Sequence, residues 1–266
     1  MDIPQFGLGT YQMDDLDECA TAVETAVDVG YRHIDTAQGY ENEAAVGDGI
    51  ARADVDREDL FVASKIDTES LAYDDVLEST RESARKLGAD SIDLMYVHWP
   101  IQTYDPEATL PALDELVDEG VIDRIGLSNF RPDQLEDAID RLDAPVYAHQ
   151  VEMHPMLPQD ELHELAVEHD HRLVAYCPIA RNQVADVPEI REVAEKHDAT
   201  PAQVSLAWLM QKENVTAIPK AASPDHITEN YAALDVELDA DDVDAIDGIE
   251  DRHRIVDFEE APWNHG

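Results

Sequence analysis

Four polar side chains with complementary proton chemistry accompany apolar segments of the sequence. Asp35 lies near the end of YRHIDT, and Tyr40 follows five residues later in a short polar loop. Lys65 follows LFVAS, and His98 ends IDLMYVH. A lysine beside a tyrosine stabilises the phenolate and lowers the phenol pKa from about 10, which would make Tyr40 a proton donor near neutral pH. Asp35 would keep Lys65 charged, and His98 would hydrogen-bond the same substrate oxygen.

This set of residues excludes some reactions and favours one. It contains no activated serine or cysteine, which argues against nucleophilic acyl transfer. Asp35 is the only acid among the four and has no second strand-end carboxylate as its partner, which weakens glycoside hydrolysis. The set suits protonation of an oxygen on which negative charge develops, as in carbonyl reduction. Because no side chain supplies hydride, a nicotinamide cofactor is implied.

Further polar residues stand at the ends of later apolar segments. Ser128, Asn129 and Gln150 would hydrogen-bond a carboxamide, and Tyr176 would stack on a nicotinamide ring. Lys220 follows the last apolar segment. Each residue alone could also have a purely structural role, such as a hydrogen bond to a main-chain group at the end of a strand. That interpretation is harder to hold when the pattern recurs at strand after strand.

These residues need a framework of strands and helices to bring them together. Apolar runs predict strands, and the segments between most of them have apolar residues at helical spacing, with Gly30, Gly88 and Gly120 as helix stops. The predicted strands cover residues 5–9, 31–36, 60–64, 92–98, 124–128, 146–151, 173–177 and 215–219.

The alternation of strands and helices predicts an α/β fold, a single (β/α)8 TIM barrel. The strand ends of such a barrel converge on one face, where active sites are built. The alternative is a doubly wound open sheet. GLGTYQ at 7–12 lacks the last glycine of the dinucleotide-binding fingerprint, so that fingerprint is absent. With no long linker, residues 1–266 are expected to form one domain.

Composition restricts the setting and the partners. The chain has 61 Asp+Glu against 18 Lys+Arg, a formal net charge of -43. Such a field would repel nucleic acid and anionic membranes, and it favours a salt-loving cytoplasm in which the repulsion is screened. There is no apolar run long enough to span a membrane and no secretion signal. The two cysteines have no metal-binding spacing. We expect a cytoplasmic monomer that binds no metal.

The chain resembles the aldo-keto reductase family from about Gly7 to Asn230. The segments that carry the resemblance are GYRHIDTAQGYENEAAVG, LGADSIDLMYVHWP, GLSNF, HQVEMHP, AYCPI and IPKAAS, in that order. The resemblance implies a (β/α)8 barrel that binds NADP(H) without a Rossmann domain. It places the catalytic tetrad on Asp35, Tyr40, Lys65 and His98, with Tyr40 as general acid and direct hydride transfer from the nicotinamide. The same residues would serve alcohol or sugar oxidation, with Tyr40 as base.

The resemblance also assigns residues to the 2′-phosphate and adenine of NADPH. Lys220 stands at the lysine position, but His226 occupies the position of a phosphate-binding arginine. Ser223 and the helix that follows it would add phosphate contacts, and Asn230 would lie near the adenine. A neutral histidine binds phosphate more weakly than arginine does. We therefore expect NADPH to be preferred, with some use of NADH.

The substrate pocket departs from the long-tailed members of the family. The chain ends soon after its last helix, as in short prokaryotic members that resemble diketogluconate reductases. Tyr11, Trp99 and Trp263 are expected to line an open pocket for small aldehydes, α-keto aldehydes or sugar-derived carbonyls. An alternative function of another class is a cofactor-sensing interaction protein, which would keep the cofactor residues but add a partner-binding surface.

Overall fold

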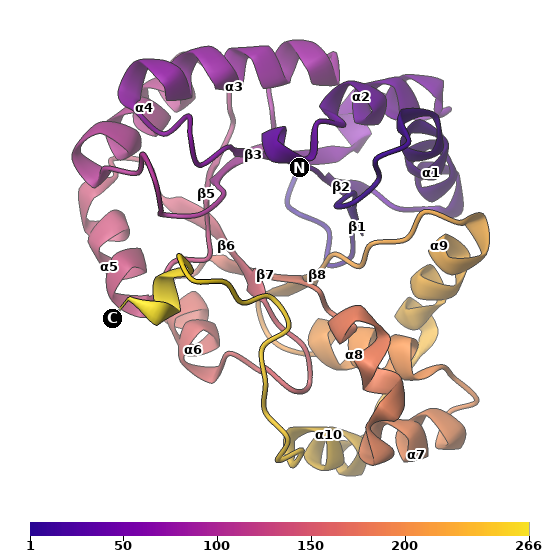
Figure 1. Cartoon of the computed structure of the whole chain (residues 1–266). Coiled ribbons are helices and arrows are strands. Elements are labelled where there is room, and N and C mark those ends of the chain that lie inside the picture. The colour runs from indigo at the N-terminus through magenta and orange to yellow at the C-terminus, as the bar shows by residue number, and fades with distance from the viewer. Residues whose placement is uncertain (266) are drawn as a thin grey trace.

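The computed structural model describes residues 1–265, and its centre is one sheet of eight parallel strands. The strands follow one another around the sheet in chain order, and Figure 1 shows the sheet curled inside a layer of helices. The strands are β1 (Leu8–Gly9), β2 (His33–Asp35), β3 (Phe61–Ile66), β4 (Leu94–Val97), β5 (Ile125–Ser128), β6 (Val146–Glu152), β7 (Arg172–Tyr176) and β8 (Val215–Ala217).

The strand order decides between the two predicted architectures. A doubly wound sheet begins in its middle and grows in both directions, so its strands do not follow chain order. Here the order is sequential from β1 to β8. Moreover, Gly7 N donates to Ala217 O at 2.9 Å, and Gly9 N donates to Pro219 O at 3.1 Å. The first and last strands are therefore joined by main-chain hydrogen bonds, and the doubly wound alternative is wrong.

Helices alternate with the strands and cover the outside of the sheet (Figure 1). The α-helices are α1 (Leu16–Val29), α2 (Glu43–Arg52), α3 (Tyr73–Leu87), α4 (Pro106–Asp118), α5 (Pro132–Arg141), α6 (Asp160–Glu168), α7 (Pro188–Lys196), α8 (Pro201–Met210), α9 (Pro224–Tyr231) and α10 (Ala240–Asp247). The 3-10 helices are η1 (Gln38–Tyr40), η2 (Arg57–Asp59), η3 (Ala180–Asp186), η4 (Ala232–Asp235) and η5 (Pro262–Asn264).

Local sequence signals account for several helix ends. Gly30 and Gly88 cap α1 and α3 in backbone conformations with φ of 128° and 65°, which glycine adopts without strain. The hydroxyl of Ser223 accepts from His226 N at the start of α9, and the carboxylate of Asp239 accepts from Asp242 N at the start of α10. The predicted helix stops at Gly30 and Gly88 are therefore confirmed.

Helix α2 is the helix that the sequence pattern did not predict. It contains Gly47 and Gly49, which weaken a helix when it is judged by propensity alone. A Cβ at Gly47 would lie 2.7 Å from Lys86 O, and a Cβ at Gly49 would lie 2.5 Å from Ala20 O. Both glycines therefore allow α2 to approach the main chains of α1 and α3 closely.

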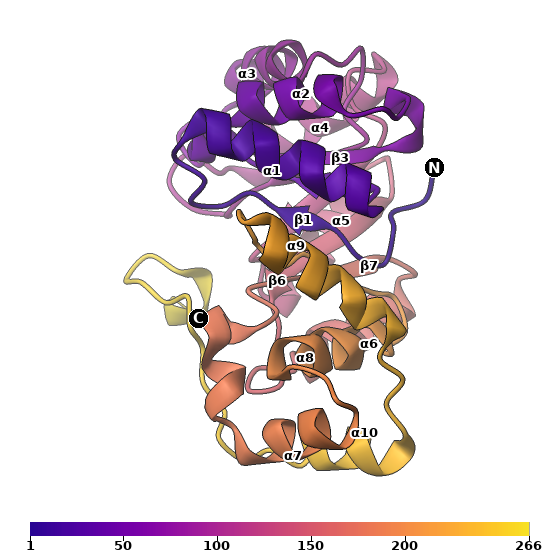
Figure 2. The ribbon, with the colours of Figure 1, turned by 90° about the vertical axis from the view of Figure 1, so that its right-hand side faces the viewer.

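The apolar core has two layers, one on each side of the sheet. The larger layer fills the space between the sheet and the helices. The smaller layer lies inside the curled sheet and consists of Ile3, Phe61, Ala63, Leu94, Tyr96, Ala148, Val174 and Ile218. Figure 2 shows the N-terminus and the segment after α10 at opposite ends of the molecule. The inner layer thus closes the end of the sheet at which the N-terminus lies and leaves the other end for a site.

Candidate active site

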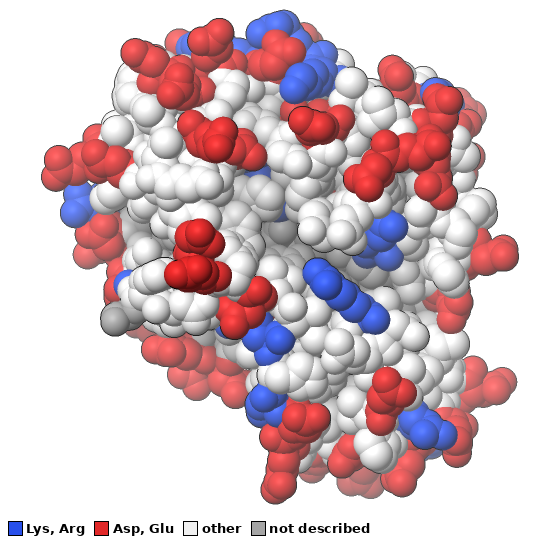
Figure 3. Space-filling model, viewed as in Figure 1, with Lys and Arg blue, Asp and Glu red and all other residues white. Residues whose placement is uncertain are grey.

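A cavity of about 480 Å³ lies at the carboxyl ends of the strands and opens at the hollow in Figure 3. Ten of the residues predicted to act at a site line it, and Lys65 is buried behind them. The ten are Tyr11, Asp35, Tyr40, His98, Trp99, Ser128, Asn129, Gln150, Tyr176 and Lys220. The lining does not include Ser223, His226, Asn230 or Trp263.

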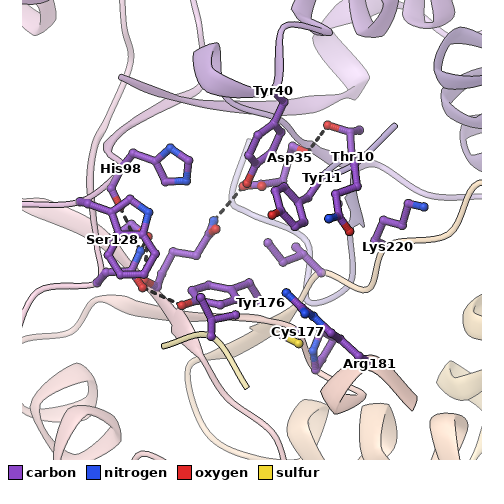
Figure 4. A pocket seen from close by; sticks show the side chains of 18 of the residues that line it. Thr10, Tyr11, Asp35, Tyr40, His98, Ser128, Tyr176, Cys177, Arg181 and Lys220 are labelled. Atoms are coloured by element: carbon purple, nitrogen blue, oxygen red, sulfur yellow. Dashed lines mark hydrogen bonds between the residues drawn. The ribbon is translucent and has the colours of Figure 1, made fainter. Parts of the chain in front are cut away.

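A buried ion pair stands at the base of the cavity. Lys65, on β3, bonds to the carboxylate of Asp35 at the end of β2, and its ammonium also donates to Thr36 O at 2.8 Å. Gln150, on β6, donates its amide to the other carboxylate oxygen of Asp35 at 2.8 Å (Figure 4). Only 1% of the Lys65 side chain and 3% of the Asp35 side chain are exposed. Three strands therefore hold one charge pair in a fixed orientation.

The surroundings shift the pKa values of both members of this pair. Burial lowers the pKa of Lys65, but the charge of Asp35 and the nearby Tyr40 raise it by more, so that the pKa lies above its ordinary value. Burial raises the pKa of Asp35, while Lys65 and Gln150 oppose that shift. The ammonium therefore keeps its proton at neutral pH.

Tyr40 lies beside this pair, in the 3-10 turn η1 that follows β2. Its ring centroid is 5.1 Å from Lys65 Nζ, 5.2 Å from the Tyr11 ring and 5.7 Å from the His98 ring. Burial raises the pKa of Tyr40, and this exceeds the lowering by Lys65. The predicted lowering of the phenol pKa is therefore wrong for the free protein. Desolvation of the phenolate outweighs its attraction to the ammonium, so the phenol stays protonated.

His98 is neutral in this setting. Burial lowers its pKa to about 3, and the charge of Lys65 adds to the effect. Its main-chain oxygen accepts from Asn129 Nδ2 at 3.0 Å, which fixes the strand end. A neutral imidazole offers one N–H donor and adds no charge to a cavity that already holds a lysine. Figure 4 shows His98 and Tyr40 facing the same space.

The four residues assigned to the nicotinamide form one hydrogen-bonded chain. Tyr176 donates its hydroxyl to Asn129 Oδ1 at 2.8 Å, Asn129 donates to Ser128 Oγ at 2.9 Å, and Ser128 donates to Gln150 O at 3.0 Å. The amide of Gln150 is engaged by Asp35, so it serves the ion pair as well. These bonds hold the Tyr176 ring against the cavity (Figure 4).

The residues assigned to the 2′-phosphate and adenine are only partly brought to the cavity. Lys220 lines it and is exposed. The Ser223 hydroxyl caps α9, Asn230 is buried in the same helix, and His226 is exposed on its first turn. These three residues lie along α9, just beyond the rim that Lys220 marks.

The pocket wall differs from its prediction in one residue. Tyr11, 49% exposed, and Trp99 line the cavity as expected. Trp263 does not; its ring packs on Trp99 at 5.6 Å. Phe258 lines the cavity instead, with its ring 4.9 Å from that of Trp99. The end of the chain thus contributes an aromatic wall, but through a different side chain.

Sequence reasoning missed several other lining residues. Arg181 lies in η3, where it and its neighbours Ala180 and Asn182 have φ of 50°, 48° and 70°. None of these three is glycine, and Asn182 is the only one whose residue type favours a left-handed turn, so the local signal for this segment is weak. The other missed residues are Gly9, Thr10, Gln12, Cys177, Pro178, Ile179, Ile218, Val256 and Phe258. Most of these lie at or just after the ends of predicted strands, which is the signal that could have found them.

Within residues 1–265, no group of three or more His, Cys, Asp or Glu is placed to hold a metal ion. No helix there has the length and apolar character needed to cross a membrane.

Comparison with known proteins agrees with this geometry. Residues 5–251 match the model of the Aldo/keto reductase family. The chain is 38% identical to the uncharacterized oxidoreductase YtbE of Bacillus subtilis over 259 residues, 96% of this chain and 92% of that protein. It is equally identical to methylglyoxal reductase DkgB of Salmonella typhimurium, over 96% of each chain.

Solved structures of related proteins have a similar fold. The crystal structure of a putative 2,5-diketo-D-gluconic acid reductase B has a TM-score of 0.93 at 34% identity, over 97% of this chain and 92% of that one. An aldo-keto reductase from a Medee basin deep-sea metagenome library, MGS-M4, has a TM-score of 0.92 at 33% identity, over 98% and 96%. This chain belongs to the aldo/keto reductase family.

Proposed function

We propose that this protein reduces aldehyde or ketone carbonyls to alcohols, reversibly, with NADPH as the preferred cofactor. The observation that carries the proposal is the convergence of Tyr40, the buried Asp35–Lys65 pair and the neutral His98 on one cavity. The main-chain bonds between the first and last strands support a closed (β/α)8 barrel of one domain as the framework.

The proton chemistry follows from the charges in the cavity. The carbonyl oxygen would lie between the Tyr40 hydroxyl and the His98 ring. Tyr40 donates its proton to that oxygen as negative charge develops, and the Lys65 ammonium stabilises the phenolate that remains. His98, neutral because its pKa is about 3, donates a hydrogen bond to the same oxygen. Asp35 and Gln150 keep Lys65 in place. In the reverse direction Tyr40 accepts the proton.

The cavity has the donor set that a nicotinamide dinucleotide needs. When bound, the nicotinamide supplies the hydride. The Tyr176 ring offers a flat surface for it, and Ser128, Asn129 and Gln150 place polar groups beside that surface. Lys220 and Arg181 line the side of the cavity away from His98, and the structure records no ion pair for either within residues 1–265 (Figure 4). Two exposed cations suit the phosphates.

The preference for NADPH rests on Lys220, with His226 and Ser223 as weaker contributors. Replacing Lys220 by alanine should weaken NADPH binding by about tenfold or more, because it removes a charge-assisted contact to the 2′-phosphate. NADH binding should change by less than about threefold. Titration of both cofactors measures the two Kd values. An equal loss for both would remove the assignment.

The substrate is proposed to be a small aldehyde, α-keto aldehyde or sugar-derived ketone. The relatives support this range, since one is named a methylglyoxal reductase and another a putative diketogluconic acid reductase. Trp99, Phe258 and Tyr11 give the cavity an aromatic wall that suits the carbon skeleton of such substrates.

The test is NADPH oxidation by the purified protein against a panel of these carbonyls. It is run in about 1 M KCl, where the Debye length is roughly 3 Å and repulsion among exposed acids is screened. Turnover that is lost in Tyr40→Phe supports the proposal. Tight NADPH binding without turnover would instead favour the cofactor-sensing alternative.

The charge pattern adds a further expectation about salt. Figure 3 shows Asp and Glu spread over much of this face, with Lys and Arg beside the hollow. With a formal net charge of -43, the free energy of unfolding should rise as KCl increases toward molar levels. Equal stability in dilute buffer would contradict adaptation to salt.

A further inference from the structure

The segment after α10 forms part of the cavity wall. We call residues 251–265 the C-terminal strap. It leaves α10 and crosses the face of the sheet on which the cavity opens, as the yellow chain in Figure 1 shows. Val256 and Phe258 of the strap line the cavity. The position of the strap therefore decides the shape of the space beside Trp99.

One buried carboxylate binds the strap next to these two residues. Glu152 is the last residue of β6, and its side chain has no exposed surface. Its Oε1 accepts from Ile255 N at 2.6 Å, and its Oε2 accepts from Val256 N at 2.7 Å. The ring Nε2 of His154, also fully buried, lies 2.8 Å from Oε1. Two successive main-chain N–H groups of the strap thus converge on one side chain.

Burying the Glu152 carboxylate costs free energy unless its oxygens are hydrogen-bonded, so its bonds to the strap are needed in the folded protein. A carboxylate removed from water needs hydrogen bonds to both oxygens, and here the strap supplies two of the three recorded. Such charge-assisted bonds are stronger than neutral ones. If the strap moved away, both oxygens would lose a partner. The carboxylate and the strap therefore hold each other in place.

The other hydrogen bonds of the strap to the rest of the chain lie on either side of the lining residues. His253 N donates to Met156 O at 3.0 Å, and near the end of the chain Arg131 donates to Pro262 O at 3.1 Å and to His265 O at 3.2 Å. Before Val256, Arg252 also bonds to Pro155 O, and the His253 ring lies 3.1 Å from Gln183 Oε1. Glu152 alone among these groups bonds directly to Val256, which lines the cavity.

Strand β6 therefore contributes two side chains to the surroundings of the site. Gln150 points to Asp35, and two residues later on the same face Glu152 points to the strap. Glu152 is also paired with Tyr176 across the β6–β7 ladder. The strap is thus fixed at the level of the strand end that carries the Tyr176 ring.

We propose that Glu152 is a positioning residue for the carbonyl substrate. It touches neither substrate nor cofactor; it holds Ile255 and Val256 so that Val256 and Phe258 face Trp99 across the cavity. The substrate part of this inference rests on the proposed reductase function. Loss of the anchor should loosen the wall that contacts the substrate and leave the cofactor side intact.

The decisive variant is Glu152→Gln, which keeps the volume of the side chain. The carboxamide has an NH2 donor in place of one carboxylate oxygen, so one of the two strap N–H groups loses its acceptor and faces a donor instead. We expect the KM for the carbonyl to rise about fivefold or more, while kcat and the Kd for NADPH change less than about twofold. A residue needed only for folding would not produce this split between KM and kcat.

Hydrogen exchange of the main-chain amides tests the anchor without any turnover. In the wild type, the amides of Ile255 and Val256 should exchange at least about a hundredfold more slowly than an unstructured chain. In Glu152→Gln their exchange should be about tenfold faster than in the wild type. The wild-type measurement stands even if the variant fails to fold.

Glu43→Gln is the matched control. Glu43 is also a buried glutamate, 2% exposed, and its Oε1 accepts from Ser64 Oγ at 2.6 Å. It lies in α2, and the bonds recorded for it involve no residue of the strap. The same chemical change there should leave strap exchange and substrate KM as in the wild type.

The inference is overturned if Glu152→Gln leaves strap exchange and KM unchanged, or if Glu43→Gln alters them equally. It is also overturned if the wild-type amides of Ile255 and Val256 exchange freely. If the wild type binds NADPH but reduces no carbonyl, the proposed function fails instead. Exchange then decides separately whether Glu152 holds the strap.

Discussion

Polar side chains at the two ends of the sheet have different surroundings. At the end near the N-terminus, Ile3 N donates to the Tyr147 hydroxyl at 2.9 Å, and the Arg124 guanidinium lies 4.8 Å from the Tyr147 ring. His33 packs edge-on against Phe61 at 5.4 Å. At the carboxyl end, Tyr40 and the other polar groups face a cavity.

This difference separates the residues that stabilise the fold from the residues that take part in the reaction. His33 and His98 have the same lowered pKa of about 3, and burial is the main cause at both positions. One is sealed in the inner core, and the other borders the cavity. Chemistry is therefore assigned by access to the cavity and not by the pKa shift alone. Changes at the closed end should affect folding, and changes at the open end should affect turnover.

The largest expected effect is at Tyr40. Tyr40→Phe removes the proton donor and should lower kcat for carbonyl reduction by about 10⁴-fold, at the upper end of what a general acid contributes. The Kd for NADPH and the thermal midpoint should stay close to wild type, because the ring and its packing remain. A kcat near that of the wild type would contradict the proton-donor assignment.

The next effect concerns the buried ion pair. Lys65→Met leaves the Asp35 carboxylate buried without its cation and should cost about 3–5 kcal/mol of folding free energy. The double variant Asp35→Asn, Lys65→Met should recover part of that loss, since it removes the unpaired charge. Denaturant unfolding of the two variants measures both. A double variant no more stable than the single one would show that charge is not the cause.

At the closed end, Ile3→Ala should lower the free energy of unfolding by roughly 2 kcal/mol, because a buried side chain is lost from the inner core. Its kcat and KM should match the wild type, since Ile3 does not line the cavity. Unfolding and steady-state kinetics of the same preparation check this pair of outcomes. A large fall in kcat would mean that the two ends are coupled.

The last effect is a change in the pH dependence of stability. A histidine whose pKa is about 3 when folded and about 6.5 when unfolded binds a proton only in the unfolded chain between those pH values. Its stabilising contribution is therefore present above pH 6.5 and is lost as pH falls toward 3. Removing one such histidine should reduce the slope of stability against pH by about 1.4 kcal/mol per pH unit.

The matched variants for this test are His33→Gln and His98→Gln. Both should show the reduced slope in unfolding experiments between about pH 4 and pH 6, because both histidines are neutral when folded. Only His98→Gln should also lower carbonyl reduction. Unchanged slopes would mean that these side chains are protonated in the folded protein.

Much of the framework was predictable from local pattern. Apolar runs gave the strands to within a few residues, and Ser223 and Asp239 marked helix starts through hydrogen bonds to their own helices. Helix α2 was missed because its reason lies elsewhere: Gly47 and Gly49 fit against the main chains of other helices. Such close approaches are long-range and leave no periodic signal.

For the site, the sequence by itself determined which side chains stand at the strand ends, because strand periodicity and residue type are local properties. Only the tertiary structure decided their surroundings. Burial raises the pKa of Tyr40 despite the nearby Lys65, and Phe258 rather than Trp263 lines the cavity. Glu152 meets the strap across more than a hundred residues of chain. Desolvation and contacts of this kind depend on how distant segments pack, which no local spacing encodes.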